Sequence, residues 1–270
     1  MNKGIIIHSI VPLRATGSEE AEQLTQLLFG ETVEVLEEAE RWIRVRNEAD
    51  GMEGWVDFKM LTKMSEEEYV GYRTELDRTT AMISMPMVFA LSRNNGQTIP
   101  LAAGTRLPKY KDGTFEILGV PFRIEPAMVL EKPLPLSQDS LMQLSRFFLN
   151  TPYLWGGKNV LGMDCSGLTQ ILMSLMGIYI LRNASEQATQ GTAVASLKEA
   201  KPCDLVFFDK NGRVTHVGFL LTQDTVLHCS GRVKVEKIDE EGIISSENNT
   251  LYRVGDHTHH LCGIRRFQQA

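Results

Sequence analysis

The sequence predicts an α+β protein in which two small β-barrels precede a larger domain whose helices come before an antiparallel sheet. Three observations support this prediction. Short β-rich runs separated by turns fill residues 1–132, Pro133-Leu134-Pro135 interrupts the chain, and beyond it helical stretches come first and strands after them. Helices and strands that are segregated along a domain are typical of α+β folds, whereas their regular alternation would indicate an α/β fold.

Residues 1–64 are predicted to form the first barrel. Apolar and polar residues alternate in short runs, and turn residues such as Asp50-Gly51 separate them, as in antiparallel sheets. The runs are residues 5–7, 32–36, 42–46 and 54–57. Residues 18–29 are polar and then apolar, which suggests a short helix or an ordered loop.

A helical linker and a second barrel are expected next. Residues 65–79 are rich in glutamate, and Ser65 suits the N-cap position of a helix. Residues 80–132 are again β-rich, with turn signals at Asn94-Asn95-Gly96 and Lys111-Asp112-Gly113.

Residues 133–270 are expected to form the third domain. A helix is predicted over residues 137–149, and a second one follows Cys165, where residues 168–175 are apolar. Strands are then predicted at residues 204–208, 215–221, 225–228 and 233–238.

The composition narrows the choice of partners. A hydrophobic content of 43% and a charged content of 23% in 270 residues are those of an ordinary globular protein. The net charge of -6 argues against nucleic acid or an anionic membrane as the main partner. Small peptides of mixed charge remain possible, and the sequence leaves the oligomeric state open.

The N-terminus and the cysteines bear on the compartment. The apolar run at residues 4–7 is broken by His8 and Ser9, so it is shorter than the roughly 7–15 residues of a secretory signal. No window reaches the roughly 18 apolar residues of a membrane span. A cytoplasmic protein is therefore expected, although removal of an export signal would leave the same sequence. Four cysteines do not suggest a disulfide scaffold, and Cys203 and Cys229 are expected to be small buried residues.

Cys165 is the candidate nucleophile. It lies between Asp164 and Ser166, directly before the apolar helical run. On the first turn of a helix, the helix dipole and unpaired backbone N–H groups stabilise a thiolate. His216 and His228 follow, and one cysteine with two histidines suits a cysteine hydrolase, in which one imidazole activates the thiol and a third polar group orients it.

The spacing of the two histidines supports this interpretation. A hairpin centred on residues 222–224 places His216 within about one rung of His228, roughly 5–8 Å away. Gly218 falls on the same face as His216 and is expected to leave room for a substrate. The alternative is a buried helix cysteine with unrelated histidines, and the occurrence of all three residues together disfavours it.

The C-terminal tail contains residue types that could bind a metal. Residues 257–262 hold three histidines and one cysteine, but they lack the two separated ligand pairs of structural zinc sites. We expect no metal and no cofactor here, and a solvated loop that leads into a last strand is favoured over zinc.

Several runs resemble the successive blocks of the NlpC/p60 cysteine peptidases. They lie between residues 135 and 268 and are Tyr153-Leu154-Trp155-Gly156-Gly157, Asp164-Cys165-Ser166-Gly167, Arg182-Asn183-Ala184-Ser185-Glu186-Gln187, Asp204-Leu205-Val206-Phe207-Phe208, Thr215-His216-Val217-Gly218 and His228-Cys229-Ser230-Gly231-Arg232. The first half, through residues 24–31 and 51–57, is similar to the bacterial SH3-like domains that precede this domain in γ-D-glutamyl-L-diamino acid endopeptidases.

This resemblance implies a papain-like catalytic domain and two SH3-like barrels. It implies that Cys165 is the nucleophile, that His216 takes its proton and that His228 orients His216. The substrate would be a peptidoglycan stem peptide, cut between γ-D-glutamate and the diamino acid through a thioester that water hydrolyses. The Cys165 backbone N–H is a natural oxyanion donor.

The resemblance also implies a substrate pocket. Tyr153 would place its hydroxyl over the thiol, Asp164 and Ser166 would hold the L-alanine end, and Ser185 would line the same pocket. Glu22, in the first barrel, would pair with a free N-terminal amine. Such a pocket would accept peptides already released from glycan, which suits cell-wall recycling or scavenging.

Three departures from the family pattern bear on substrate preference. Cys203 replaces a turn glycine, Asn183 stands where an aspartate is common, and Met52 stands where a tyrosine is frequent. Two other functions remain as alternatives: a non-hydrolytic module that binds wall peptides, and an amidase or acyl transferase of the same fold. The intact Cys165, His216 and His228 favour hydrolysis.

Overall fold

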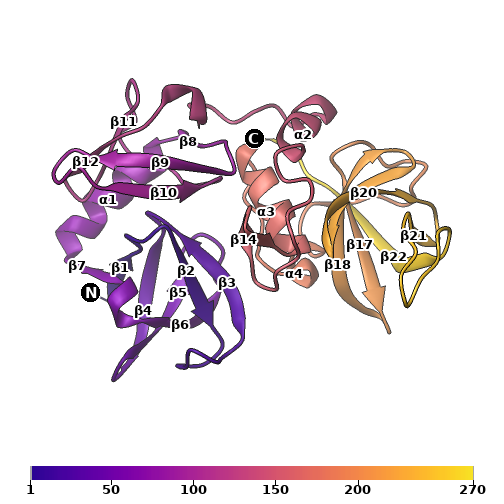
Figure 1. Ribbon diagram of the computed structural model, residues 1–270, viewed down its shortest axis with the longest axis horizontal. Coiled ribbons are helices and arrows are strands. Elements are labelled where there is room, and N and C mark those ends of the chain that lie inside the picture. The colour runs from indigo at the N-terminus through magenta and orange to yellow at the C-terminus, as the bar shows by residue number, and fades with distance from the viewer. Residues whose placement is uncertain (1, 270) are drawn as a thin grey trace. The chain divides into compact units, whose positions relative to one another are not determined.

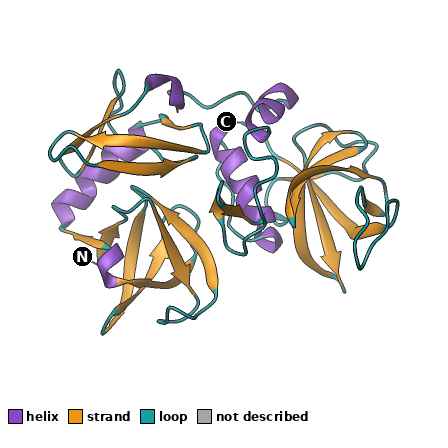
Figure 2. Cartoon of the chain, in the orientation of Figure 1, coloured by secondary structure: helices purple, strands orange, loops and turns teal. Residues whose placement is uncertain are grey.

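The computed structural model describes residues 2–269, and the chain divides into two compact units between Pro133 and Leu134. Figure 1 labels the elements of each unit, and Figure 2 distinguishes helices from strands. Each unit has its own buried apolar core and is described by itself.

The first part of the N-terminal unit is an antiparallel sheet around an apolar core. Its strand order is β3-β2-β6-β5-β4-β1-β7. The strands are β1 (Lys3–Ile5), β2 (Ile10–Arg14), β3 (Gln23–Leu28), β4 (Thr32–Ala39), β5 (Trp42–Asn47), β6 (Glu53–Asp57) and β7 (Thr62–Met64), with a 3-10 turn at Phe58–Met60. Alternate residues such as Ile43 and Val45 are buried while Arg44 and Arg46 are exposed, which is the period of two expected of a half-buried strand.

Helix α1 (Glu66–Arg78) follows, and it begins at Ser65 as the sequence predicts. The Ser65 hydroxyl accepts from the Glu68 amide at 3.2 Å, and the Glu68 carboxylate accepts from the Ser65 amide at 2.8 Å. Tyr72 and Leu76 are buried in one core with residues of the following strands. The Tyr72 hydroxyl also donates to the Gly30 carbonyl at 2.7 Å. The helix is therefore part of the core of this unit.

The rest of the N-terminal unit consists of two small sheets. One has the order β10-β9-β12-β11 and the other pairs β13 with β8. The strands are β8 (Met82–Ile83), β9 (Met87–Ser92), β10 (Thr98–Ala102), β11 (Thr114–Ile117), β12 (Val120–Arg123) and β13 (Val129–Leu130), with a 3-10 turn at Pro126–Met128.

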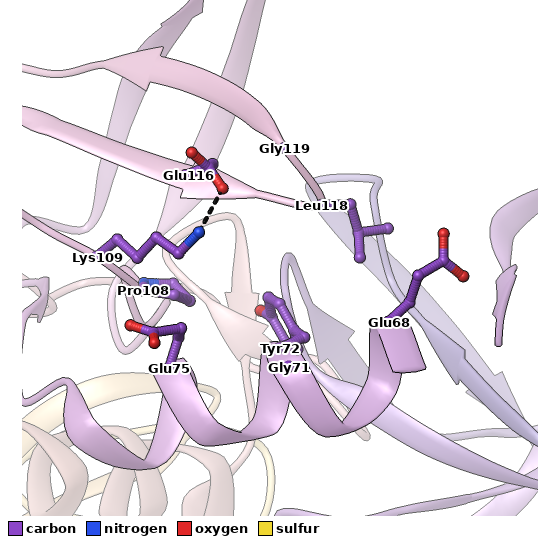
Figure 3. Close-up of a pocket in the computed structure, with 9 residues that line it drawn as sticks. All are labelled: Glu68, Gly71, Tyr72, Glu75, Pro108, Lys109, Glu116, Leu118 and Gly119. Atoms are coloured by element: carbon purple, nitrogen blue, oxygen red, sulfur yellow. Dashed lines mark hydrogen bonds and ion pairs between the residues drawn. The ribbon is translucent and has the colours of Figure 1, made fainter. Parts of the chain in front are cut away.

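A cavity of about 470 Å³ lies in this unit, between α1 and the strands that follow it (Figure 3). Tyr72 and Glu75 border it from the helix, and the ion pair between Lys109 and Glu116 borders it from the opposite side, at 2.6 Å. The cavity belongs to a different unit from Cys165.

The C-terminal unit begins with helices, as predicted for an α+β domain. They are α2 (Gln138–Ser145), α3 (Cys165–Leu175) and the short α4 (Ala184–Gln187). All residues of α3 except Ser174 are buried, because α2 and the strands cover it on several sides. A two-stranded sheet of β14 (Lys158–Asn159) and β15 (Gly162–Met163) precedes α3.

A closed antiparallel sheet completes the C-terminal unit. Its strands run in the order β22-β17-β18-β19-β20-β21, β21 pairs back to β22, and β16 adds to β22 outside the ring. The strands are β16 (Thr192–Ala193), β17 (Leu205–Lys210), β18 (Arg213–Thr222), β19 (Thr225–Ser230), β20 (Arg232–Ile238), β21 (Gly242–Ile244) and β22 (His257–Arg266). This α+β arrangement confirms the predicted fold class.

Two local predictions need comment. Residues 18–29 hold strand β3, paired with β2, where a helix or loop was expected. Cys203, at the position where the family pattern predicts a turn glycine, adopts a φ of 75°. This left-handed conformation costs a non-glycine residue roughly 1–2 kcal/mol, so the turn is kept despite the substitution.

Candidate active site

Asp164 and Arg182 hold the beginning of α3 in place. Asp164 is the N-cap, and its carboxylate accepts from the amides of Gly167 at 2.6 Å and Gly156 at 2.8 Å. Arg182 binds the same carboxylate with two nitrogens, at 3.0 and 2.7 Å, and both side chains are buried. A buried pair of this kind is stable because each charge meets several hydrogen bonds.

Ser166 belongs to the same network. Its hydroxyl donates to Asp164 at 3.2 Å and accepts from Arg182 at 2.8 Å. Gly167 lets the preceding turn approach, because a Cβ there would collide with the Gly157 carbonyl oxygen. The residues that flank Cys165 therefore fix the start of the helix, while the substrate contacts predicted for Asp164 and Ser166 stay predictions.

Cys165 is the first residue of α3 and is buried, with 5% of its surface exposed. Burial raises the pKa of the thiol to about 12, and the Asp164 carboxylate adds to this effect. The backbone amides of Val217 and Ser166 donate to the sulfur and, with Arg182, act in the opposite direction on the pKa. Burial of the thiol therefore opposes the expected stabilisation of the thiolate, whereas the amide contacts and Arg182 favour it.

His216 on β18 and His228 on β19 are joined by a hydrogen bond. Nε2 of His216 lies 2.9 Å from Nδ1 of His228, and the two rings are nearly perpendicular. The strand register pairs Gly218 with His228, and His216 lies two residues before Gly218 on the same face of the sheet. Because the Val217 amide reaches the Cys165 sulfur, this pair lies beside the thiol.

Gly218 serves a purpose other than the one predicted. A Cβ at this position would lie 2.7 Å from Cγ2 of Val226, 2.8 Å from the Leu227 oxygen and 3.0 Å from Cβ of His228. The space beside His216 is therefore filled by strand β19, and it is not open to a substrate. Glycine at residue 218 lets the two strands approach closely enough for the histidines to meet.

Glu236 on β20 extends the histidine pair and was missed by the sequence analysis. Its Oε2 lies 3.0 Å from Nε2 of His228 and also 3.0 Å from Nζ of Lys234. Its Oε1 accepts from the amide and the hydroxyl of Ser246, at 2.8 and 2.7 Å. The register argument that joined the histidines would have found it, since Glu236 pairs with Val226 in the next hairpin.

The surroundings of the two histidines favour their neutral forms. Burial, followed by the neighbouring His228 and His259, lowers the pKa of His216 well below its usual value. Burial also lowers the pKa of His228, although Glu236 opposes this. A neutral imidazole beside a protonated thiol is able to accept the thiol proton.

His259 is a second residue that the sequence analysis misplaced. The tail was expected to be a solvated loop that leads into a last strand, and strand β22 is present but already begins at His257. The His259 ring lies 4.3 Å from that of His216, tilted by 33°, and burial lowers its pKa to about 4. Among residues 2–269, no group of histidine, cysteine, aspartate and glutamate is arranged to hold a metal ion.

The other residues predicted to bind the substrate lie at different distances from the thiol or in another unit. Tyr153 is about one-third exposed, and burial, then the neighbouring Cys165 and Asp164, raises the pKa of its phenol, which places the hydroxyl near the thiol. Ser185 is exposed on α4. Glu22 belongs to the N-terminal unit, directly before β3, and is exposed there. The structure thus brings Tyr153, Asp164 and Ser166 together with the thiol and the histidines.

Comparison with known proteins identifies the family. Residues 150–250 match the NlpC/P60 family, and residues 13–61 match the bacterial dipeptidyl-peptidase SH3 domain. A gamma-D-glutamyl-L-lysine dipeptidyl-peptidase of Bacillus subtilis (strain 168) is 32% identical over 259 residues, which cover 90% of this chain and 80% of that protein. The chain belongs to the NlpC/P60 family of cysteine peptidases.

Other members extend the similarity. A protein of the same name from Bacillus cereus is 25% identical over 228 residues, which are 76% of this chain and 66% of that protein. The crystal structure of an NlpC/P60 family protein from Bacillus cereus has the same fold, with a TM-score of 0.80 at 20% identity over 98% of this chain and 99% of that one. No helix among the described residues is long and apolar enough to cross a membrane.

Proposed function

We propose that this NlpC/P60 peptidase hydrolyses the bond between γ-D-glutamate and the diamino acid of peptidoglycan stem peptides. The observation that carries the proposal is Cys165 at the start of α3, beside the hydrogen-bonded pair of His216 and His228. The names of the two relatives, both gamma-D-glutamyl-L-lysine dipeptidyl-peptidases, support the choice of bond.

The reaction uses Cys165 as the nucleophile and His216 as the base. As the sulfur attacks the γ-carbonyl carbon, His216 takes the thiol proton, so that no preformed thiolate is needed. The Cys165 backbone N–H stabilises the oxyanion. When the C–N bond breaks, His216 returns the proton to the departing amine. Water then attacks the thioester, gives its proton to His216 and releases the acid, and Cys165 regains its proton.

The proposed substrate is a released peptide with a free N-terminal L-alanine. Glu22 would pair with the ammonium group, Asp164, Ser166 and Ser185 would line the alanine end, and Tyr153 would cover the thiol. A peptide already freed from glycan suits wall-peptide recycling, and a cytoplasmic site of action is part of this proposal.

The test is incubation of the protein with L-Ala-γ-D-Glu-meso-diaminopimelate and, separately, with the L-lysine peptide, followed by mass spectrometry. We expect release of L-Ala-D-Glu by the unaltered protein and none by Cys165→Ala, whose Tm should stay nearly unchanged. Comparison of the two rates identifies the diamino acid. Binding without cleavage would favour the non-hydrolytic alternative, and products coupled to an added amine would favour acyl transfer.

A further inference from the structure

The roles proposed for Cys165, His216 and His228 do not explain why the buried carboxylate of Glu236 is hydrogen-bonded to His228. We propose that Glu236 is a positioning residue, which sets the tautomers of His228 and His216 so that Nδ1 of His216 is free to take the thiol proton. The inference rests on the proposed function, because it assigns how the base of that reaction is prepared.

Glu236 is built to remain a carboxylate. It is 4% exposed, and its two oxygens accept four hydrogen bonds, from His228, Lys234 and the amide and hydroxyl of Ser246. Although burial acts to raise the pKa of Glu236, these hydrogen bonds hold it well below its usual range. An ionised carboxylate accepts hydrogen bonds and donates none.

The tautomers follow from this one acceptor. Because Glu236 can only accept, Nε2 of His228 must carry the proton that joins them at 3.0 Å. A neutral imidazole has a single N–H, so Nδ1 of His228 is an acceptor. It lies 2.9 Å from Nε2 of His216, which must therefore be the donor. Nδ1 of His216 is left with a lone pair for the Cys165 proton.

The charges around Glu236 fit this order of donors. Lys234 on β20 shares Oε2 with His228, and it lies 4.0 Å from the exposed Glu247. Ser246 fixes Oε1 from the loop after β21, and the neutral His259 on β22 stacks against His216. Among the described residues, only Lys234 and His228 donate to Oε2. The His228 imidazole therefore faces a carboxylate oxygen that can only accept.

Replacement of the Glu236 carboxylate by a carboxamide should reverse the direction of the hydrogen bonds that link residue 236, His228 and His216. In Glu236→Gln, keeping the oxygen toward Ser246 turns the NH₂ group toward His228, whose Nε2 must then accept. His228 would donate from Nδ1, His216 would accept at Nε2, and its Nδ1 would already carry a proton. The opposite orientation would set the NH₂ group against the Ser246 amide N–H, which would lose its acceptor even when the Ser246 hydroxyl turns to accept.

The first experiment is made on the unaltered protein labelled with ¹⁵N-histidine and needs no substrate, and variants serve only to assign its signals. We expect NMR spectra at pH 7 to show protonated Nε2 and unprotonated Nδ1 on both His216 and His228, assigned with His216→Gln and His228→Gln. A protonated Nδ1 on either ring would overturn the proposal. The spectrum tests the proposed tautomers even if the protein cleaves no stem peptide, in which case only the proposed function is wrong.

The second experiment compares Glu236→Gln with Glu247→Gln. We expect Glu236→Gln to lower kcat by roughly 100-fold or more, as other wrong-tautomer variants do, with little change in KM and with altered histidine tautomers. Glu247→Gln removes the same charge near Lys234 but touches neither histidine, so kcat and the spectrum should be unchanged. Normal kcat and tautomers in a folded Glu236→Gln would overturn the proposal. If that variant does not fold, the spectrum of the unaltered protein decides.

Discussion

The protonation states of the Cys165 thiol and the His216 imidazole determine the pH range in which the site can react. Burial favours the protonated thiol by raising its pKa, and it favours the neutral imidazole by lowering its pKa. In the mechanism proposed above, general-base transfer between these two neutral groups makes the nucleophile.

This protonation predicts the pH dependence of the reaction. A histidine base is lost when it is protonated, which for a free imidazole occurs near pH 6.5. Since the pKa of His216 is lowered well below that value, the acid limb of kcat/KM should lie below pH 6.5. The profile should be recorded at constant ionic strength with the stem peptide as substrate. An acid limb centred at or above pH 6.5 would contradict the neutral, buried base.

The sequence singled out Cys165, His216 and His228 as candidate residues, but it did not show their surroundings. Cys165, His216 and His228 could be found because their residue types and spacing are visible within one helix start and one hairpin. Glu236 and His259 lie on other strands, and they reach the site only through the registers of β20 and β22. The pKa of Cys165 depends on burial by distant segments, which no local pattern contains.

At the scale of elements, the close approach of β18 and β19 joins the two histidines. Gly218→Ala should push these strands apart, because the new Cβ would lie 2.8 Å from the Leu227 backbone oxygen. We expect kcat to fall by about 10-fold or more, since small misplacements of catalytic groups are costly. Steady-state kinetics with a thermal melt will check this.

Gly263→Ala is the matched control, because Gly263 is in β22 of the same sheet and a Cβ there meets nothing within 4 Å. Its kinetics should stay close to those of the unaltered protein. Equal activity of Gly218→Ala and Gly263→Ala would show that strand separation does not govern the site.

The elements that sequence predicted and missed differ in a physical way. Strands β17, β18, β19 and β20 of the closed sheet were predicted because their apolar runs are bounded by clear turns. Strand β2 lies outside the predicted runs, and it tolerates Pro12 because it pairs with β6 only at Arg14. The missed partner β3 has its polar residues at one end, which hid its pairing.

At the scale of the whole molecule, the proposed role of Glu22 predicts that the N-terminal unit affects which peptides are accepted. If Glu22 pairs with a free amine, acetylating the L-alanine of the substrate removes the charge that it recognises. We expect kcat/KM to fall by about 100-fold or more, because a site built for a polar group rejects the analogue that lacks it. Paired kinetics of the two peptides will measure this.

Glu22→Gln provides the corresponding control on the protein side. It should reduce the difference between the free and acetylated peptides without abolishing cleavage. Equal rates for both peptides with the unaltered protein would exclude recognition of the free amine.

The burial of Cys165 also bears on how the protein tolerates oxidants. Peroxide attacks thiolates far faster than thiols, and sulfinic and sulfonic acids are not readily reversed. A thiol that is 5% exposed, and whose pKa is raised by burial, offers such a reagent little access to a thiolate. We therefore expect the burial that positions Cys165 for attack on a bound peptide also to slow its oxidation in the resting protein.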